Sequence, residues 1–272
     1  MVLLGYSSAR RTLCAFKEPR KTECGAMGPL GYGGARRTLC AYAFEVGMDK
    51  RIIVAIDGPA GAGKSTIARR VAHRLGFVYI DTGAMYRAVA LWALQAGIPL
   101  DDTHRLEQLA REARIEFAGT QVLLNGEDVT SAIREPHVSD AASQTAACPG
   151  VRRAMREEQR RIASSISAVM EGRDIGTVVF PEAQVKVFLD ADPQERARRR
   201  AGELGVEGEA REQIAHEMSE RDQRDRTRAE APLAQAPDAD YLDTSVLTLE
   251  QVEEAILKLV RDKTSNGKAT HS

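Results

Sequence analysis

The chain has 272 residues, of which 43% are hydrophobic and 28% are charged, values typical of a globular protein with one or two domains. Its formal net charge of −1 provides no overall positive field, so we expect no nucleic-acid partner. No stretch approaches the roughly 20 apolar residues that cross a bilayer, and the N-terminus lacks the apolar core of a secretory signal, so we expect no membrane partner.

The N-terminal region contains one short segment twice, because residues 4–16 recur with few changes as residues 30–42. Two copies are too few for a stacked repeat fold, and the region has few apolar residues to offset its ordering entropy. We therefore predict that residues 1–47 are a disordered extension outside the functional protein, and that Met48 is the functional start. An organelle-targeting segment is the alternative, but the glutamates in this region argue against it.

Cysteine usage favours a reducing, cytoplasmic compartment. Three of the four cysteines lie before residue 48, and only Cys148 lies in the rest of the chain. Their spacing fits neither a disulfide framework nor a zinc site. A thiol-rich interaction module in the N-terminal region is the alternative that these cysteines leave open.

The rest of the chain is organised around residues 58–65, which read Gly-Pro-Ala-Gly-Ala-Gly-Lys-Ser. They follow an apolar run, 52–56, typical of a buried parallel strand, and precede a predicted helix over 66–75. Glycines let consecutive N–H groups point inward at the positive end of that helix, which suits a polyphosphate. This pattern is a P-loop, in which Lys64 would reach the β- and γ-phosphates and the Ser65 hydroxyl would bind Mg²⁺. A structural glycine-rich turn, the alternative, would not place Lys-Ser after its last glycine. We expect this loop to face solvent.

Further apolar runs predict four more strands, at residues 77–80, 168–171, 185–189 and 241–242. Helical patterns lie between them: Asp192-Pro193 is typical of a helix start, and residues 248–251 form a capping box before a helix with an apolar face. Strands that alternate with helices predict an α/β fold with a doubly wound five-stranded parallel sheet.

The span between the strands at 77–80 and 168–171 is too long for one crossover, so it must contain structure of its own. Apolar pairs on both sides of Asn125-Gly126 predict a small antiparallel element, and residues 151–166 predict a helix. We expect this insert, about 82–167, to lie above the carboxyl edge of the sheet, where α/β proteins bind ligands.

Charged residues follow the predicted strands at that same edge, which favours a second ligand beside the P-loop. An arginine-rich segment, about 193–228, comes later in the chain and is predicted to be a lid that closes over the site. A solvated helix pair with ion pairs along its surface is the alternative for this segment.

Six stretches together resemble the bacterial-type cytidylate (CMP/dCMP) kinases, within the P-loop nucleoside monophosphate kinases: residues 56–66, 81–87, 141–144, 151–152, 172–181 and 221–228. The resemblance covers about 48–263 and leaves 264–272 as a polar C-terminal tail. It implies an ATP-dependent kinase of pyrimidine metabolism that transfers the γ-phosphoryl group of ATP to CMP or dCMP, with Mg²⁺. Nothing in the sequence demands more than a monomer.

The resemblance also implies the site residues. ATP would be bound by Gly58, Pro59, Ala60, Gly61, Ala62, Gly63, Lys64, Ser65 and Thr66, with Ser65 on the metal. CMP would be bound by Thr82, Arg87, Ser143, Arg152, Arg173, Asp174, Arg221, Asp225 and Arg228. The residues expected to act on the transferred group are Lys64, Arg173, Arg200 and Arg228.

Within that set, Ser143, Arg152 and Asp174 would read cytosine, and Thr82 would line the same pocket, where many relatives look to have serine. Arg87, Arg173 and Arg228 would hold the monophosphate, and Arg221 with Asp225 would contact the ribose. A carboxylate and a guanidinium complement cytosine but not uracil, whose pattern at N3 and C4 is reversed.

Two other functions stay open. A P-loop kinase for another small acceptor shares the donor chemistry. A GTPase-like switch would need a guanine-reading Asn-Lys-x-Asp sequence, which does not follow the P-loop.

Overall fold

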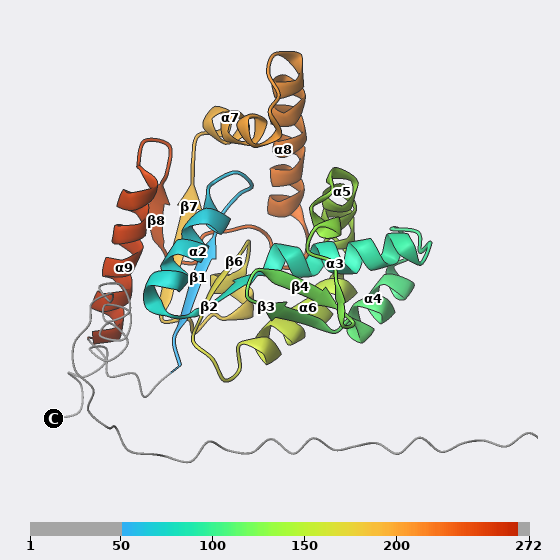
Figure 1. Ribbon diagram of the computed structural model, residues 1–272, viewed down its shortest axis with the longest axis horizontal. Helices are drawn as coiled ribbons and strands as arrows, with labels where there is room; N and C mark the ends of the chain where they lie inside the picture. Colours follow the sequence, from blue (N-terminus) through green and yellow to red (C-terminus); the bar gives the residue numbers. More distant parts are fainter. Residues whose placement is uncertain (1–50, 266–272) are drawn as a thin grey trace, which may run out of the picture. The chain divides into compact units, whose positions relative to one another are not determined.

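The structure is a computed structural model that describes residues 51–265, so the predictions for residues 1–47 lie outside the described part. The described residues contain a five-stranded parallel sheet in the order β2-β6-β1-β7-β8 (Figure 1). Its strands are β1 (Ile53–Asp57), β2 (Val78–Asp81), β6 (Ala168–Gly172), β7 (Val185–Asp190) and β8 (Asp240–Asp243). The predicted α/β fold and all five predicted strands are confirmed.

The central strand β1 and its neighbour β6 are buried along their whole length, which explains why they read as continuous apolar runs. On one face of the sheet, α2 (Lys64–Leu75) and α9 (Leu249–Ser265) form a core through side chains such as Ile67 and Ile256. On the other face, a second cluster includes Ile53, Met170 and Ile175. The sheet is therefore covered on both sides, and only its strand ends are free to build a site.

The helix ends behave as the sequence indicates. Gly76 ends α2 in the left-handed conformation, with φ of 67°. The capping box before α9 forms in both directions, because Thr248 Oγ1 accepts from Gln251 N and Gln251 Oε1 accepts from Thr248 N. Helix α9 continues to Ser265, two residues into the predicted polar tail, and the rest of that tail lies outside the described residues.

The insert between β2 and β6 has its own small sheet and its own core. Its elements are α3 (Thr82–Gln95), α4 (Thr103–Glu112), β3 (Ile115–Ala118), β4 (Gln121–Leu124), β5 (Glu127–Asp128), a 3-10 turn (Ala132–Arg134), α5 (Pro136–Thr145) and α6 (Pro149–Ile162). The antiparallel order β3-β4-β5 and the positive φ values of Asn125 and Gly126 confirm the predicted hairpin. The predicted helix is α6, but it ends at Ile162, because the chain must turn to enter β6 at Ala168, and Ser167 O already accepts from Val78 N.

Two helices, α7 (Pro193–Leu204) and α8 (Glu209–Thr227), form the arginine-rich segment. Asp192 caps α7 by accepting from the N–H groups of Gln194 and Glu195, as the sequence predicts. Figure 1 shows both helices beyond the end of the sheet at which β1 runs into the P-loop. The P-loop, the ends of β2 and β6, and this helix pair therefore meet at one edge.

Candidate active site

The P-loop has the backbone conformation that its glycines allow. Gly58, Gly61 and Gly63 have φ values of 149°, 75° and 85°, a region that side chains disfavour. A Cβ at Gly58 would lie 1.9 Å from Leu189 O, and one at Gly61 would lie 2.8 Å from Met218 Cε. The first glycine is thus required by the neighbouring strand, and the second by its positive φ and by Arg196 of α7, whose Cβ and carbonyl oxygen would lie 3.0 and 3.2 Å from a Cβ there.

We predicted that the P-loop faces solvent; Ser65 is exposed, but the Lys64 side chain is buried, with 6% of the residue exposed. The loop folds back over the side chain, and Lys64 Nζ donates to Pro59 O at 2.6 Å. Burial and the neighbouring Arg173 lower the pKa of Lys64 from 10.5 to about 7. A buried ammonium in this state lacks sufficient negative charge around it, and a bound polyphosphate would supply that charge.

The side-chain oxygens of Ser65 and Glu171 meet beside the P-loop. Ser65 Oγ donates to Glu171 Oε2 at 2.9 Å, and the Tyr79 hydroxyl donates to Glu171 Oε1. Burial, with the nearby Asp81, raises the pKa of Glu171. Between residues 51 and 265 no group of three or more acidic, His or Cys side chains could hold a metal alone. A hydroxyl and a carboxylate nevertheless fit Mg²⁺ that is shared with nucleotide phosphates.

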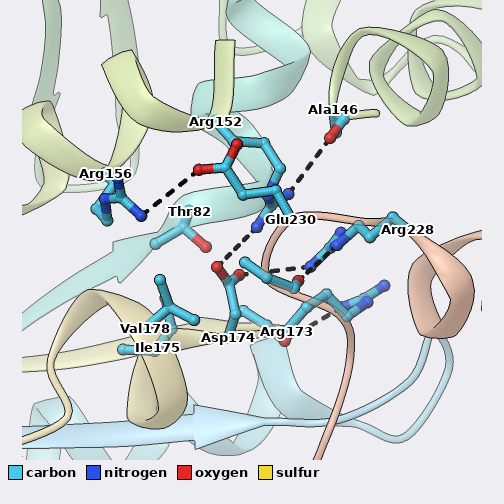
Figure 2. A network of polar contacts seen from close by, with 12 residues as sticks. Thr82, Ala146, Arg152, Arg156, Arg173, Asp174, Ile175, Val178, Arg228 and Glu230 are labelled. Atoms are coloured by element: carbon cyan, nitrogen blue, oxygen red, sulfur yellow. Dashed lines mark hydrogen bonds and ion pairs between the residues drawn. The ribbon is translucent and has the colours of Figure 1, made fainter. Parts of the chain in front are cut away.

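The predicted acceptor residues meet in a buried ionic network across the same edge. Figure 2 shows Arg152 and Arg228 pointing toward the carboxylate of Asp174. The distances are 2.7 Å from Arg152 Nη2 to Asp174 Oδ2 and 3.6 Å from Arg228 Nη2 to Asp174 Oδ1. Asp225 adds two contacts, 3.2 Å to Arg228 Nη1 and 2.9 Å to Arg173 Nε. The insert, the end of β6 and the end of α8 thus each contribute charges to one cluster.

Four of the predicted acceptor residues have a buried polar atom without a hydrogen-bond partner: Arg87 Nε, Ser143 Oγ, Arg152 Nε and Arg228 Nη2. Buried polar groups are rarely left unpaired, and a ligand or ordered water is a usual explanation. Other hydrogen bonds hold Thr82 and Arg87 in place. Thr82 Oγ1 donates to Glu171 O at 2.6 Å, and Arg87 Nη2 donates to Asp81 Oδ2 at 2.9 Å.

Arg173 and Arg221 lie close to Lys64 of the P-loop and affect its protonation. Burial and Arg173 lower the pKa of Arg221 to about 10, and Arg221 forms no hydrogen bond or ion pair with the described residues. Arg173 and Arg221 also contribute to the low pKa of Lys64. Two cations with lowered pKa values, Lys64 and Arg221, next to Arg173 define a site that a polyanion would stabilise.

The helix pair α7–α8 contacts the P-loop through Arg196, which belongs to the predicted arginine-rich lid, and Asp222; neither was predicted as a site residue. Arg196 Nη1 lies 2.5 Å from Asp222 Oδ2 and donates to Ala60 O at 3.0 Å. Both side chains are buried. Asp222 Oδ1 in turn accepts from Ala60 N. These contacts place both helices directly over the P-loop.

Arg200, which we expected at the reacting phosphate, is not part of this cluster. It pairs with Glu203 at 2.8 Å, and 42% of its side chain is exposed. Arg200 lies one turn beyond Arg196 on α7, and that turn moves it away from the P-loop. The contact made by Arg196 could be inferred only from the direction in which α7 leaves β7, a feature that sequence periodicity does not contain.

A parallel sheet with a P-loop on its first strand, a facing cationic acceptor site and arginine-bearing helices above both defines the class of P-loop kinases. A family profile described as cytidylate kinase matches residues 54–262. The chain therefore belongs to the cytidylate kinase family.

Two relatives named cytidylate kinase agree with that assignment. A protein from Solibacter usitatus (strain Ellin6076) named cytidylate kinase is 62% identical over 223 residues, which cover 80% of this chain and 96% of that protein. A cytidylate kinase from Pelotomaculum thermopropionicum is 50% identical over 214 residues, 76% of this chain and 95% of that protein. A solved gluconokinase from Sinorhizobium meliloti 1021 is 17% identical, with a TM-score of 0.42, and covers 81% of this chain and 98% of its own.

Proposed function

We propose that this protein transfers the γ-phosphoryl group of ATP to CMP or dCMP and releases ADP with CDP or dCDP, a step of pyrimidine nucleotide metabolism. The observation that best supports the acceptor is the buried Arg152–Asp174–Arg228 network, which lies beside the P-loop and has unpaired donors. Family membership supports the same reaction.

The base-reading step follows from donors and acceptors. Cytosine presents an amino group and two acceptors, N3 and O2. The Asp174 carboxylate would accept from the amino group, while Arg152 Nε and Ser143 Oγ are donors without partners in the described structure. Uracil has a carbonyl where cytosine has the amino group, so it would set an acceptor against the Asp174 carboxylate. A buried mismatch of this kind gives strong discrimination.

The phosphoryl transfer needs positioning and charge neutralisation, and no general base, because the acceptor phosphate is already anionic. Arg87, Arg173 and Arg228 would hold that phosphate, since each presents a guanidinium at the acceptor side of the edge. Lys64 would bind the β- and γ-phosphates from the donor side. A bound phosphate would restore the ordinary protonation of Lys64, whose pKa is low while the polyanion is absent.

The metal and the helix pair would complete the site. Ser65 and Glu171 would hold Mg²⁺, which neutralises charge on the β- and γ-phosphates. The pair α7–α8 would act as a lid, because Arg196 and Asp222 already bind the backbone of Ala60. A closed lid excludes water and so protects ATP from hydrolysis.

The cellular setting is part of the proposal. We place the reaction in the cytoplasm and expect a monomer, and both stay predictions. Among the helices of residues 51–265, none has the length and apolar character that a membrane crossing requires.

The test is a coupled ADP-release assay of the purified protein with CMP, dCMP, UMP, AMP and shikimate. We expect rapid turnover with CMP or dCMP and much slower turnover with the others. Preference for shikimate or AMP would refute the proposed acceptor while leaving the P-loop chemistry in place. Equal turnover of CMP and UMP would refute only the base-reading role of Asp174 and would leave the kinase activity in place.

A further inference from the structure

Asp57, the last residue of β1, joins the two halves of the site. Its carboxylate is buried, with 5% of the residue exposed, and it directly precedes Gly58 of the P-loop. Asp57 Oδ1 accepts from Ile175 N at 2.9 Å, and Oδ2 accepts from Gly176 N at 2.7 Å. One carboxylate therefore holds two consecutive N–H groups of the turn that follows β6.

Those N–H groups begin the π-helical turn Ile175–Val179, and the first N–H groups of a helical turn have no partner within it. The residue before such a turn usually supplies the cap, and an aspartate is well suited to that role. Here that residue is Asp174, which makes no capping hydrogen bond. Instead, its two carboxylate oxygens face Arg152 and Arg228.

We propose that Asp57 is a positioning residue that caps the 175–179 turn in place of Asp174, and so frees the Asp174 carboxylate to read the acceptor base. This inference rests on the base-reading role proposed for Asp174. It also gives β1 a second function, because the strand that presents the P-loop then fixes the position of the acceptor-reading turn.

The surroundings of Asp57 agree with a cap that has an electrostatic cost. Burial raises the pKa of Asp57 to about 6, while the N–H groups of Gly176 and Ile175 and the charge of Lys64 oppose that rise. The charge of Asp174, at the start of the turn, raises the pKa of Asp57 further. From β7, Lys186 packs beside Gly176, but its ammonium pairs with Asp238.

The cross-strand neighbours of Asp57, Gly172 and Phe188, are uncharged. The Asp57 anion is therefore poorly stabilised. This is expected of a carboxylate whose role is to position the 175–179 turn and not to stabilise the fold.

The decisive variant is Asp57→Asn, which keeps the shape but can accept only one of the two N–H groups, because its amide nitrogen is a donor. We expect kcat/KM for CMP to fall about tenfold to a hundredfold and the CMP:UMP ratio of kcat/KM to fall with it, while KM for ATP changes little. The melting temperature should change little, because the removal of a buried charge offsets the loss of one hydrogen bond to the turn. Asp190→Asn is the matched control, since Asp190 ends the neighbouring strand β7 and its carboxylate accepts from Ala191 N. It should keep the wild-type CMP:UMP ratio.

Asp174→Asn separates this inference from the proposed function. If Asp174→Asn removes CMP:UMP discrimination and Asp57→Asn does not, the positioning inference is wrong and the base-reading role stands. If Asp174→Asn leaves discrimination intact, the base-reading role itself is wrong, and the inference falls with it. A fall in melting temperature with unchanged discrimination in Asp57→Asn would reduce Asp57 to a structural residue.

A second measurement uses the wild-type protein and no variant. The amide proton chemical shifts of Ile175 and Gly176 should titrate together with a midpoint near pH 6, the pKa of Asp57. The CMP:UMP ratio of kcat/KM should fall as the pH falls through the same range. The ionisation of the nucleotide phosphate cancels in that ratio, because both substrates have it. Flat amide shifts, or a ratio that stays constant through the titration, would overturn the proposal.

Discussion

Replacing Asp174 with asparagine tests the acceptor site at the atom on which its specificity is proposed to depend. The wild-type carboxylate is 2.7 Å from Arg152 Nη2 and has only 10% of its side chain exposed, so solvent cannot replace it. The carboxamide can turn its donor toward the cytosine amino group, and one charged hydrogen bond to CMP is lost. Such a bond contributes roughly 1.5–3 kcal/mol, which corresponds to about a 10- to 150-fold loss of kcat/KM for CMP.

The assay is steady-state ADP release with CMP and with UMP, together with ATP binding by calorimetry. ATP binding should change little. Asp225→Asn is the matched control, because Asp225 contacts Arg173 and Arg228 in the same network but is assigned to the ribose and phosphate side. That variant should lower CMP and UMP efficiency by the same factor. Equal losses for CMP and UMP in Asp174→Asn would show that Asp174 does not read the base.

Three further predictions concern the donor site, the phosphate contacts and the N-terminal region. Lys64→Ala should abolish turnover without unfolding the protein. The pKa of Lys64 in the folded protein, about 7, lies below its ordinary value of 10.5, so between these pH values the unfolded chain binds one more proton than the folded protein. The unliganded wild type should therefore gain stability relative to Lys64→Ala as the pH rises from 7 to 9. Melting temperatures that change with pH in the same way for both proteins would contradict this. Arg228→Lys should be nearly as damaging to kcat/KM as Arg228→Ala, because a point charge cannot replace a guanidinium that meets Asp174 and Asp225 together, and full rescue by lysine would reduce Arg228 to a generic positive charge. A truncation that begins at Met48 keeps Arg51, which donates to Ala163 O, and should match the full chain in activity and melting temperature; a melting temperature several degrees lower would show that residues 1–47 stabilise the enzyme.

The sequence predicts most of the fold because its signals are local. Each strand of the main sheet is a short apolar run, and the hairpin of the insert follows from Asn125-Gly126, whose positive φ values few other residue pairs accept. The end of α6 could not be predicted from local sequence, since it depends on the hydrogen bond between Ser167 O and Val78 N, residues far apart in the chain.

The candidate site was predicted in its residue types but not in its contacts. The family resemblance indicates Arg152, Asp174 and Arg228, and the structure brings them together, although their roles stay predictions. The cap that Asp57 provides joins positions 118 residues apart, and no periodic pattern reports such a pair. Lys64 was misjudged for a related reason: its burial depends on how the loop closes over Nζ, which is a property of the folded backbone.

The separate core of the insert has a consequence for engineering. Side chains such as Leu106, Ile115, Ile133 and Met155 pack within the insert. The chain passes between the insert and the main sheet at two places, between Asp81 and Thr82 and through residues 163–167. These two joints are natural boundaries for exchanging the insert between related kinases. A chimaera made in this way would import Ser143 and Arg152 from the foreign insert but retain Asp174 from the host sheet. Acceptor specificity would therefore transfer only when the sequence after β6 is exchanged as well.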